Sequence, residues 1–178
     1  MKIIITGANG FIGSNLVKYL EKEYELLTVS RNKFKNLQNN YDLTSFLNPN
    51  NFEQIYNFKA THFIHIAAIA HKKIQKNYLY LKELRLVNEI LPLKLYKLSE
   101  KLNIKRYIFL STVGVNGYRT LNNQLINELS PYECSNFYSK SKMYAEKSLI
   151  KASKGSQTKL VILRPATVYG RDCPGNFN

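Results

Sequence analysis

Hydroxyl and amine side chains occur in this sequence at a spacing that suits proton transfer. Tyr138 and Lys142 lie four residues apart, so in a helix they share one face. A phenol with a pKa of about 10 is a poor base at neutral pH unless a nearby positive charge stabilises the phenolate. Lys142 supplies such a charge. Ser111 and Thr112 follow a strand-like run, at the strand end where open α/β sheets bind ligands.

A glycine-rich turn stands between the first strand-like run and the first helical pattern. Gly7 and Gly10 allow a tight turn and a close approach to a pyrophosphate, and Gly13 allows the helix to pack near the sheet. The helix N-terminus adds free N–H groups and partial positive charge. This context predicts a dinucleotide site. Its predicted contacts are Gly7, Asn9, Gly10, Phe11, Ile12 and Gly13.

The choice between NAD and NADP depends on the end of the second strand. Many NAD-binding proteins place a carboxylate there for the ribose hydroxyls, but this strand is followed by Arg31. An arginine can meet a 2′-phosphate, which gives NADP a modest preference, although Arg31 can equally lie in solvent or stack on adenine. Asp42, followed by Leu43, is better placed to bond the adenine amino group.

The positioning elements alternate between strand and helix patterns, which predicts a parallel sheet. We expect one domain over residues 1–178, an α/β fold with a three-layer, doubly wound sheet of strand order 3-2-1-4-5-6 or a variant. A kink is predicted at Pro92. The predicted strands are Lys2 to Thr6, Glu25 to Ser30, His62 to Ala67, Arg106 to Leu110 and Lys159 to Leu163. The predicted helices run from Phe11 to about Glu23, from about Asn77 to Leu102 and from about Asn136 to about Ala152. Ser135 or Asn136 is expected to cap the third of them.

Composition argues against several other classes of protein. The net charge of +14 attracts polyanions, but the lysines are spread along the chain, which disfavours nucleic-acid binding. Cys134 and Cys173 lack the spacing of a metal site or a disulfide framework. The first apolar run is too short for a membrane span or a signal segment, so we expect a cytoplasmic protein that does not enter membranes.

These motifs together resemble the extended short-chain dehydrogenase/reductase family, in its NAD-dependent epimerase/dehydratase branch. The resemblance rests on the glycine turn, on Asp42-Leu43, on His65-Ile66-Ala67-Ala68 and on the order of the hydroxyl, Tyr and Lys residues. It implies that Thr112, rather than Ser111, holds the substrate oxygen, and that Lys142 also binds the nicotinamide ribose. The further positions that it implies at the cofactor are Ala67, Ala68, Asn88 and Pro165, with Asn176 at the sugar nucleotide.

The resemblance also implies a nucleotide-sugar substrate. It favours a UDP-sugar 4-epimerase that transfers hydride at C4, typically in cell-surface polysaccharide synthesis. A 4-keto-sugar reductase that consumes NAD(P)H is a close rival. A dehydratase is disfavoured, because Val113 and Gly114 stand where such enzymes have acids. A non-catalytic dinucleotide-binding module has no need of Tyr138 and Lys142.

Family members continue beyond this point into a C-terminal lobe that binds much of the substrate. The resemblance therefore implies that this lobe is largely absent from the 178 residues. It also implies a possible homodimer through the helices of Asn88 and Tyr138.

Overall fold

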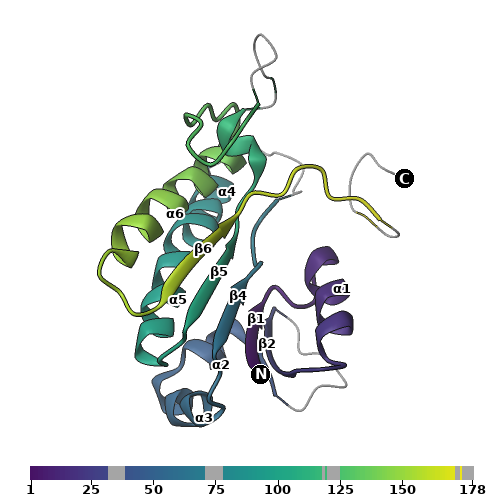
Figure 1. The fold of residues 1–178 in the computed structure, drawn as a ribbon, viewed down its shortest axis with the longest axis vertical. Helices are drawn as coiled ribbons and strands as arrows, with labels where there is room; N and C mark the ends of the chain where they lie inside the picture. The colour runs from purple at the N-terminus through teal and green to yellow at the C-terminus, as the bar shows by residue number, and fades with distance from the viewer. Residues whose placement is uncertain (32–38, 71–77, 118, 120–124, 171–172, 174–178) are drawn as a thin grey trace.

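A computed structural model describes residues 1–31, 39–70, 78–117, 119, 125–170 and 173. They form a six-stranded parallel sheet of order β3-β2-β1-β4-β5-β6, which confirms the predicted topology (Figure 1). The strands are β1(Lys2–Thr6), β2(Glu25–Ser30), β3(Asn40–Asp42), β4(His62–His65), β5(Arg106–Leu110) and β6(Lys159–Leu163). The order reverses between β1 and β4, so the switch point lies at the carboxyl ends of these two strands.

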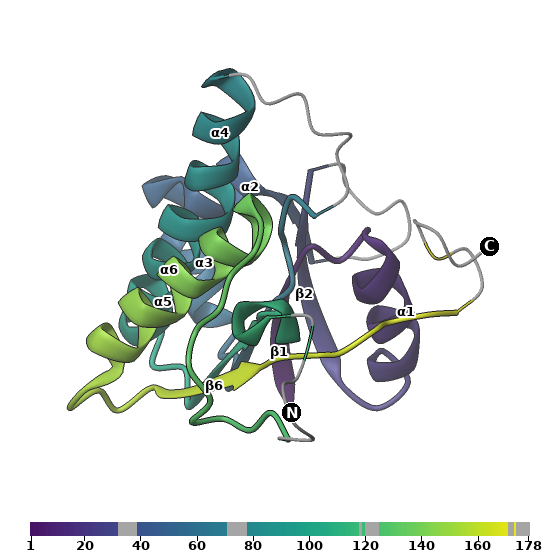
Figure 2. The ribbon, with the colours of Figure 1, turned by 90° about the horizontal axis from the view of Figure 1, so that it is seen from above.

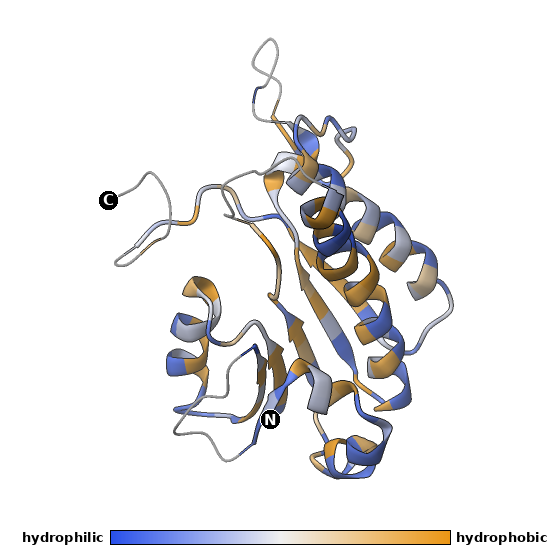
Figure 3. Cartoon of the chain, turned by 180° about the vertical axis from the view of Figure 1, so that it is seen from behind, coloured by the Kyte–Doolittle hydropathy of each residue, from blue (hydrophilic) through white to orange (hydrophobic). Residues whose placement is uncertain are grey.

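Helices cover both faces of the sheet. One face carries α1(Phe11–Leu20), and the helices α4(Tyr78–Arg85), α5(Leu91–Lys101) and α6(Phe137–Ser153) lie on the other (Figure 2). The central strands between these layers are largely hydrophobic, and the helices carry both hydrophobic and hydrophilic residues (Figure 3). Ile4, Phe63 and Phe109 are buried in the larger core cluster, and Ile3 and Ile5 pack under α1. This is the three-layer arrangement that the alternating patterns predict.

The long helix predicted around Pro92 is divided by a π-helix. The segment η2(Leu86–Ile90) lies between α4 and α5, and the Leu91 N–H bonds to Leu86 O. A proline removes one N–H and crowds the carbonyl four residues before it, here that of Asn88. The wider π turn accommodates this, so the irregularity falls just before Pro92.

Several short elements lie outside the predicted set. They are β3, α2(Leu43–Leu47), the 3-10 turn η1(Pro49–Asn51), α3(Phe52–Asn57) and the 3-10 turn η3(Val113–Asn116). Elsewhere the bounds differ by a few residues: α1 ends at Leu20 and β4 at His65. Of the two predicted caps, Asn136 is the N-cap of α6 and forms a capping box with Ser139. Every helix within the described ranges is too short or too polar to cross a bilayer.

Candidate functional site

The turn between β1 and α1 can be built only with glycine at two positions. Gly7 has φ +76°, and a Cβ added there would lie 2.6 Å from Ala67 N in the segment after β4. A Cβ at Gly13 would lie 2.1 Å from Gly7 O. Side chains at these positions would push apart the turn, the helix and the neighbouring strand end. The three segments therefore meet closely at the switch point.

The N-terminus of α1 has the character of an anion site. Its N-cap residue is Gly10, which forms no side-chain cap, and the first turn holds no acid. Asn9 and Gly10 are exposed, and Phe11 and Ile12 are half-buried. The first N–H groups of the ten-residue helix are therefore open to a negatively charged group, and the helix dipole favours one. A pyrophosphate fits these residues.

The predicted adenosine-side residues lie at the ends of two paired strands. Arg31 is exposed directly after β2, and Asp42 pairs with Ser30 across the sheet. The Asp42 carboxylate accepts hydrogen bonds from Ser45 N at 2.8 Å and Ser45 Oγ at 2.7 Å, so it caps α2, which begins at Leu43. The Asp42 carboxylate thus has a local role as the N-cap of α2, which was not predicted.

Asn88 joins the segment after β4 to helix α6. Its side chain is fully buried, accepts from Ile69 N at 2.8 Å and donates to Ile69 O at 3.1 Å. It also donates to Ser141 Oγ, which in turn donates to Tyr138 O. The half-buried Ala67 and Ala68 precede this clamp. Asn88 thus connects the predicted cofactor-lining segment with the helix that carries Tyr138.

Lys142 places a buried amine at the carboxyl end of β5. Its side chain is 1 % exposed, Nζ donates to Leu110 O at 2.7 Å, and Nζ lies 4.6 Å from the centre of the Phe109 ring. Burial lowers the pKa of Lys142 to about 7, against the opposing effect of the Glu146 carboxylate. Tyr138, one helical turn earlier, is half-buried. Strongly perturbed amines of this kind gather at functional sites.

The two candidate hydroxyls after β5 have different surroundings. Ser111 is buried and donates to the carboxylate of Glu146. Thr112 is half-buried, has extended backbone angles and accepts from Gly114 N at 3.2 Å. Side chains alternate along extended backbone, so Thr112 leaves the chain on the side opposite Ser111. Within the described residues no acceptor takes the Thr112 hydroxyl proton.

His65 belongs to this region but had no predicted role. Its ring stacks on Phe109, and Nδ1 lies 2.5 Å from Thr6 Oγ1. Nε2 is buried without a partner among the described residues. Burial, and then the charge of Lys142, hold the pKa of His65 well below 6.5. The ring is therefore neutral, and it adds no second cation beside Lys142.

The segment that follows β6 first bonds to the residues after β5 and then approaches α1. Pro165 O accepts from Val113 N at 3.0 Å, and a Cβ added to Gly170 would meet the Phe11 ring at 3.5 Å. The segment runs from the end of β6 to the start of α1 (Figure 2). The predicted substrate residue Asn176 lies outside the described residues.

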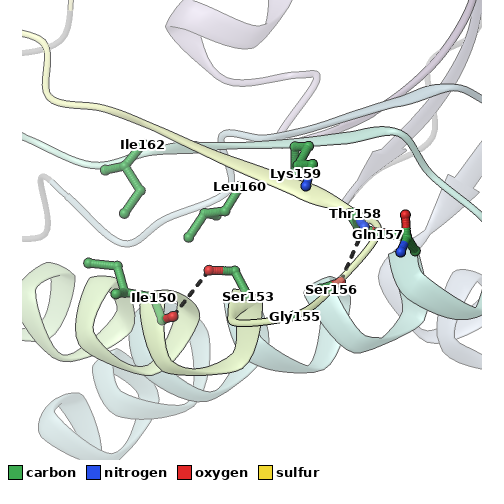
Figure 4. Close-up of a pocket in the computed structure, with 9 residues that line it drawn as sticks. All are labelled: Ile150, Ser153, Gly155, Ser156, Gln157, Thr158, Lys159, Leu160 and Ile162. Atoms are coloured by element: carbon green, nitrogen blue, oxygen red, sulfur yellow. Dashed lines mark hydrogen bonds between the residues drawn. The ribbon is translucent and has the colours of Figure 1, made fainter.

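A hollow of about 570 Å³ lies elsewhere, between the end of α6 and the start of β6 (Figure 4). Its lining runs from Ile150 to Ile162, and the hydroxyls of Ser153 and Ser156 bond to nearby backbone. The predicted site residues lie at the carboxyl ends of the strands, whereas this hollow lies at the amino end of β6. It is therefore distinct from the candidate site.

Comparisons with known proteins agree with this architecture. The NAD dependent epimerase/dehydratase family model matches residues 3–178. A UDP-glucose 4-epimerase of Vibrio cholerae is 32% identical over 179 residues, which cover 98% of this chain and 54% of that protein. A crystal structure of UDP-glucose 4-epimerase from Thermotoga maritima with UDP-glucose superposes with TM-score 0.79 at 28% identity, over 99% of this chain and 59% of that one. A UDP-glucuronic acid 4-epimerase from Bacillus cereus in complex with NAD gives TM-score 0.78 at 23% identity, over 96% of this chain and 57% of that one.

The chain spans about half the length of these relatives. The family model nevertheless matches almost every residue of it. The chain belongs to the NAD-dependent epimerase/dehydratase family.

Proposed function

We propose that this chain forms the dinucleotide-binding part of an NAD(P)-dependent enzyme that interconverts nucleoside-diphosphate sugars, with 4-epimerisation of a UDP-sugar as the reaction. One observation carries the proposal: Lys142 is buried at the end of β5, one helical turn after Tyr138. A buried amine costs stability, and its charge is useful where a phenol must lose a proton. The 32% identical relative is a UDP-glucose 4-epimerase, which supports this choice of reaction.

The glycine turn and the start of α1 would hold the cofactor pyrophosphate. Arg31 and Asp42 would lie on its adenosine side, and Ala67, Ala68 and Pro165 near its nicotinamide. When bound, the cofactor supplies a carbon that accepts a hydride and later returns it. The structural relative from Bacillus cereus carries NAD. NADP is also a candidate cofactor, because Arg31 can meet its 2′-phosphate. Titration of the protein with NAD and with NADP decides between the two.

The chain's own residues would manage the proton and the substrate oxygen. Thr112 would donate a hydrogen bond to the sugar hydroxyl oxygen and hold it in place. Tyr138 would take the hydroxyl proton while positive charge at Lys142 stabilises its phenolate. The neutral His65 ring leaves Lys142 as the cation next to Phe109. Return of the proton from Tyr138 would complete the cycle.

A 4-keto-sugar reductase is the second candidate, and it uses the same residues. The sequence from Ser111 to Gly117 resembles that class at least as well. A reductase consumes NAD(P)H with every turnover, whereas an epimerase regenerates its cofactor. Net loss of NAD(P)H absorbance with a 4-keto sugar nucleotide therefore identifies the reductase.

The decisive experiment begins with the full-length protein. Cofactor binding is measured by titration, and turnover is then screened against a panel of nucleotide sugars. Replacing Tyr138 by Phe removes only the phenolic oxygen, so turnover should fall by at least about 100-fold with cofactor affinity nearly unchanged. Absence of binding to both NAD and NADP refutes the epimerase and the reductase together. Unchanged turnover in Tyr138→Phe removes that residue from the mechanism.

We also propose a homodimer formed by the helices of Asn88 and Tyr138. Large apolar side chains are exposed on this helical layer, among them Leu79 at 72%, Tyr144 at 51% and Leu86 at 48%. Pairing such surfaces removes them from water. Sedimentation of the wild type should give a dimer and that of Tyr144→Lys a monomer. A wild-type monomer at about 100 µM, a weak affinity by the usual scale, contradicts the proposal.

A further inference from the structure

One buried carboxylate lies on the same helix as the proposed catalytic pair. Glu146 is fully buried, four residues after Lys142 and eight after Tyr138. Charges are rarely buried unless they are paired and hydrogen-bonded, because desolvation is costly. The proposed reaction gives this carboxylate no direct role.

Three side chains from different segments donate to the Glu146 carboxylate. Arg164, just after β6, donates from Nη2 at 2.7 Å and from Nε at 3.1 and 3.2 Å. Tyr132 donates from its hydroxyl at 2.9 Å, and Ser111 donates from the end of β5. Both carboxylate oxygens are therefore satisfied, and the guanidinium approaches in the paired geometry that fixes orientation as well as distance.

The arginine extends this network beyond the carboxylate. Its Nη1 donates to Asn116 Oδ1 at 3.2 Å and to Glu128 O at 3.4 Å. Asn116 then donates to the carbonyls of Ser130 and Pro131. The network thus joins helix α6, the ends of β5 and β6, the turn η3 and the segment that leads back to α6.

Hydrogen bonds of this network and of the segment after β6 hold the two neighbours of Thr112. The preceding residue, Ser111, is held by Glu146 through its side chain and by Leu163 O through its N–H at 2.7 Å. The following residue, Val113, is held by Pro165 O. Thr112 therefore stands between two fixed neighbours, and the side-chain tie from Ser111 leads to the helix of Tyr138 and Lys142.

We propose that Glu146 is a positioning residue, whose buried carboxylate holds Thr112 at a fixed place relative to Tyr138 through Ser111 and Arg164. This inference rests on the proposed function. A purely structural ion pair would affect the stability of the fold but would leave the turnover number of the folded protein unchanged. The two roles therefore predict different results.

The test is a double-mutant cycle in the full-length protein, with Glu146→Gln, Arg164→Gln and the double variant. Misplacing a reacting group by about 1 Å can cost about 100-fold in rate, so we expect each variant to lose about 10- to 100-fold in kcat. KM and cofactor Kd should stay within about threefold. Glu25→Gln, which removes an exposed partner of Lys2 at the amino end of β2, should leave kcat unchanged.

The double variant separates positioning from stability. It removes the buried charge of Glu146 together with the half-buried charge of its partner Arg164, so it should recover thermal stability relative to the single variants. Its kcat should stay low, because the paired contact between the guanidinium and the carboxylate is lost. Recovery of kcat together with stability overturns the proposal. Unchanged kcat in Glu146→Gln overturns it as well.

A second readout does not depend on turnover. Amide hydrogen exchange of the peptide containing Thr112 to Asn116 should rise by about tenfold in Glu146→Gln, because local opening becomes easier, while β1 and β2 keep their wild-type exchange. Wild-type exchange in that peptide refutes the proposal even if no substrate is found. If cofactor binding is absent but exchange rises as expected, the proposed function fails and the positioning of the β5 end by Glu146 stands.

Discussion

The buried position of Lys142 predicts that replacing it with methionine will stabilise the protein while abolishing turnover. Methionine is unbranched, apolar and similar in length, so it can fill the space between Phe109 and Leu110 that the lysine stem occupies. It lacks the amine whose burial lowers the pKa of Lys142 to about 7. The variant loses the charge required by the proposed mechanism, and it also loses the cost of burying that charge.

The magnitude follows from the difference between the folded and unfolded amine. A pKa that falls from 10.5 to about 7 on folding corresponds to a penalty of about 5 kcal/mol for the protonated form, at about 1.4 kcal/mol per pH unit. The unfolded chain binds the extra proton between these pH values. The penalty is therefore fully present below pH 7 and disappears as the pH rises toward 10.5. Between pH 6 and pH 9 the advantage of Lys142→Met should shrink by about 3 kcal/mol.

Urea unfolding of the cofactor-free protein at several pH values measures this difference. Subtracting wild type from variant cancels the titration of the groups that do not interact with Lys142. Lys140→Met, at an exposed position of the same helix, is the matched control and should change the free energy of unfolding by at most about 0.5 kcal/mol. A difference between Lys142→Met and wild type that does not vary with pH would show that the pKa of Lys142 is not lowered on folding.

Three further predictions concern the surrounding frame. Gly13→Ala should abolish cofactor binding in a titration, because the new methyl group would lie 2.1 Å from Gly7 O; affinity within about threefold of wild type contradicts this, since such a change is under about 1 kcal/mol. Asn88→Leu should lower the free energy of unfolding by about 2 to 4 kcal/mol in urea, because Ile69 N–H and C=O lose their partner. Asn136→Ala should cost about 1 kcal/mol by removing the cap of α6, and an unchanged unfolding midpoint would argue against that cap.

The sheet could be predicted from the sequence because most of its strands are apolar runs of strand length separated by helical patterns. Five of the six strands are visible in this way. The sixth, β3, has three half-buried residues, Asn40 to Asp42, and no apolar run. Its place is fixed by pairing with β2, which is a tertiary effect. The π-helix before Pro92 could not be predicted either, because a proline indicates that the helix is disturbed but not how the backbone accommodates it.

The candidate site was predictable where its residues form local patterns. The glycine turn and the Tyr138–Lys142 pair have fixed spacing, whereas the Asn88 clamp joins Ile69 and Ser141, which are far apart in sequence. The sequence did contain a signal for Glu146, because it continues the four-residue spacing of Tyr138 and Lys142 on a helix. A carboxylate on the buried face of an amphipathic helix requires a cationic partner, but no spacing rule identifies Arg164 as that partner.

A long-range contact of Glu146 distinguishes the two neighbouring hydroxyls at the end of β5. Ser111 and Thr112 are adjacent and chemically similar, so the sequence alone favours Thr112 only by resemblance. Glu146 distinguishes the two residues, because its carboxylate accepts a hydrogen bond from the Ser111 hydroxyl, whereas the extended backbone turns Thr112 to the other side. If Glu146 is replaced by Leu, Ser111 loses its acceptor and the difference between the two hydroxyls should weaken. In that background Thr112→Ala should reduce kcat less than it does in the wild type, and an equal loss in both backgrounds would show that the Glu146 contact has no part in selecting Thr112.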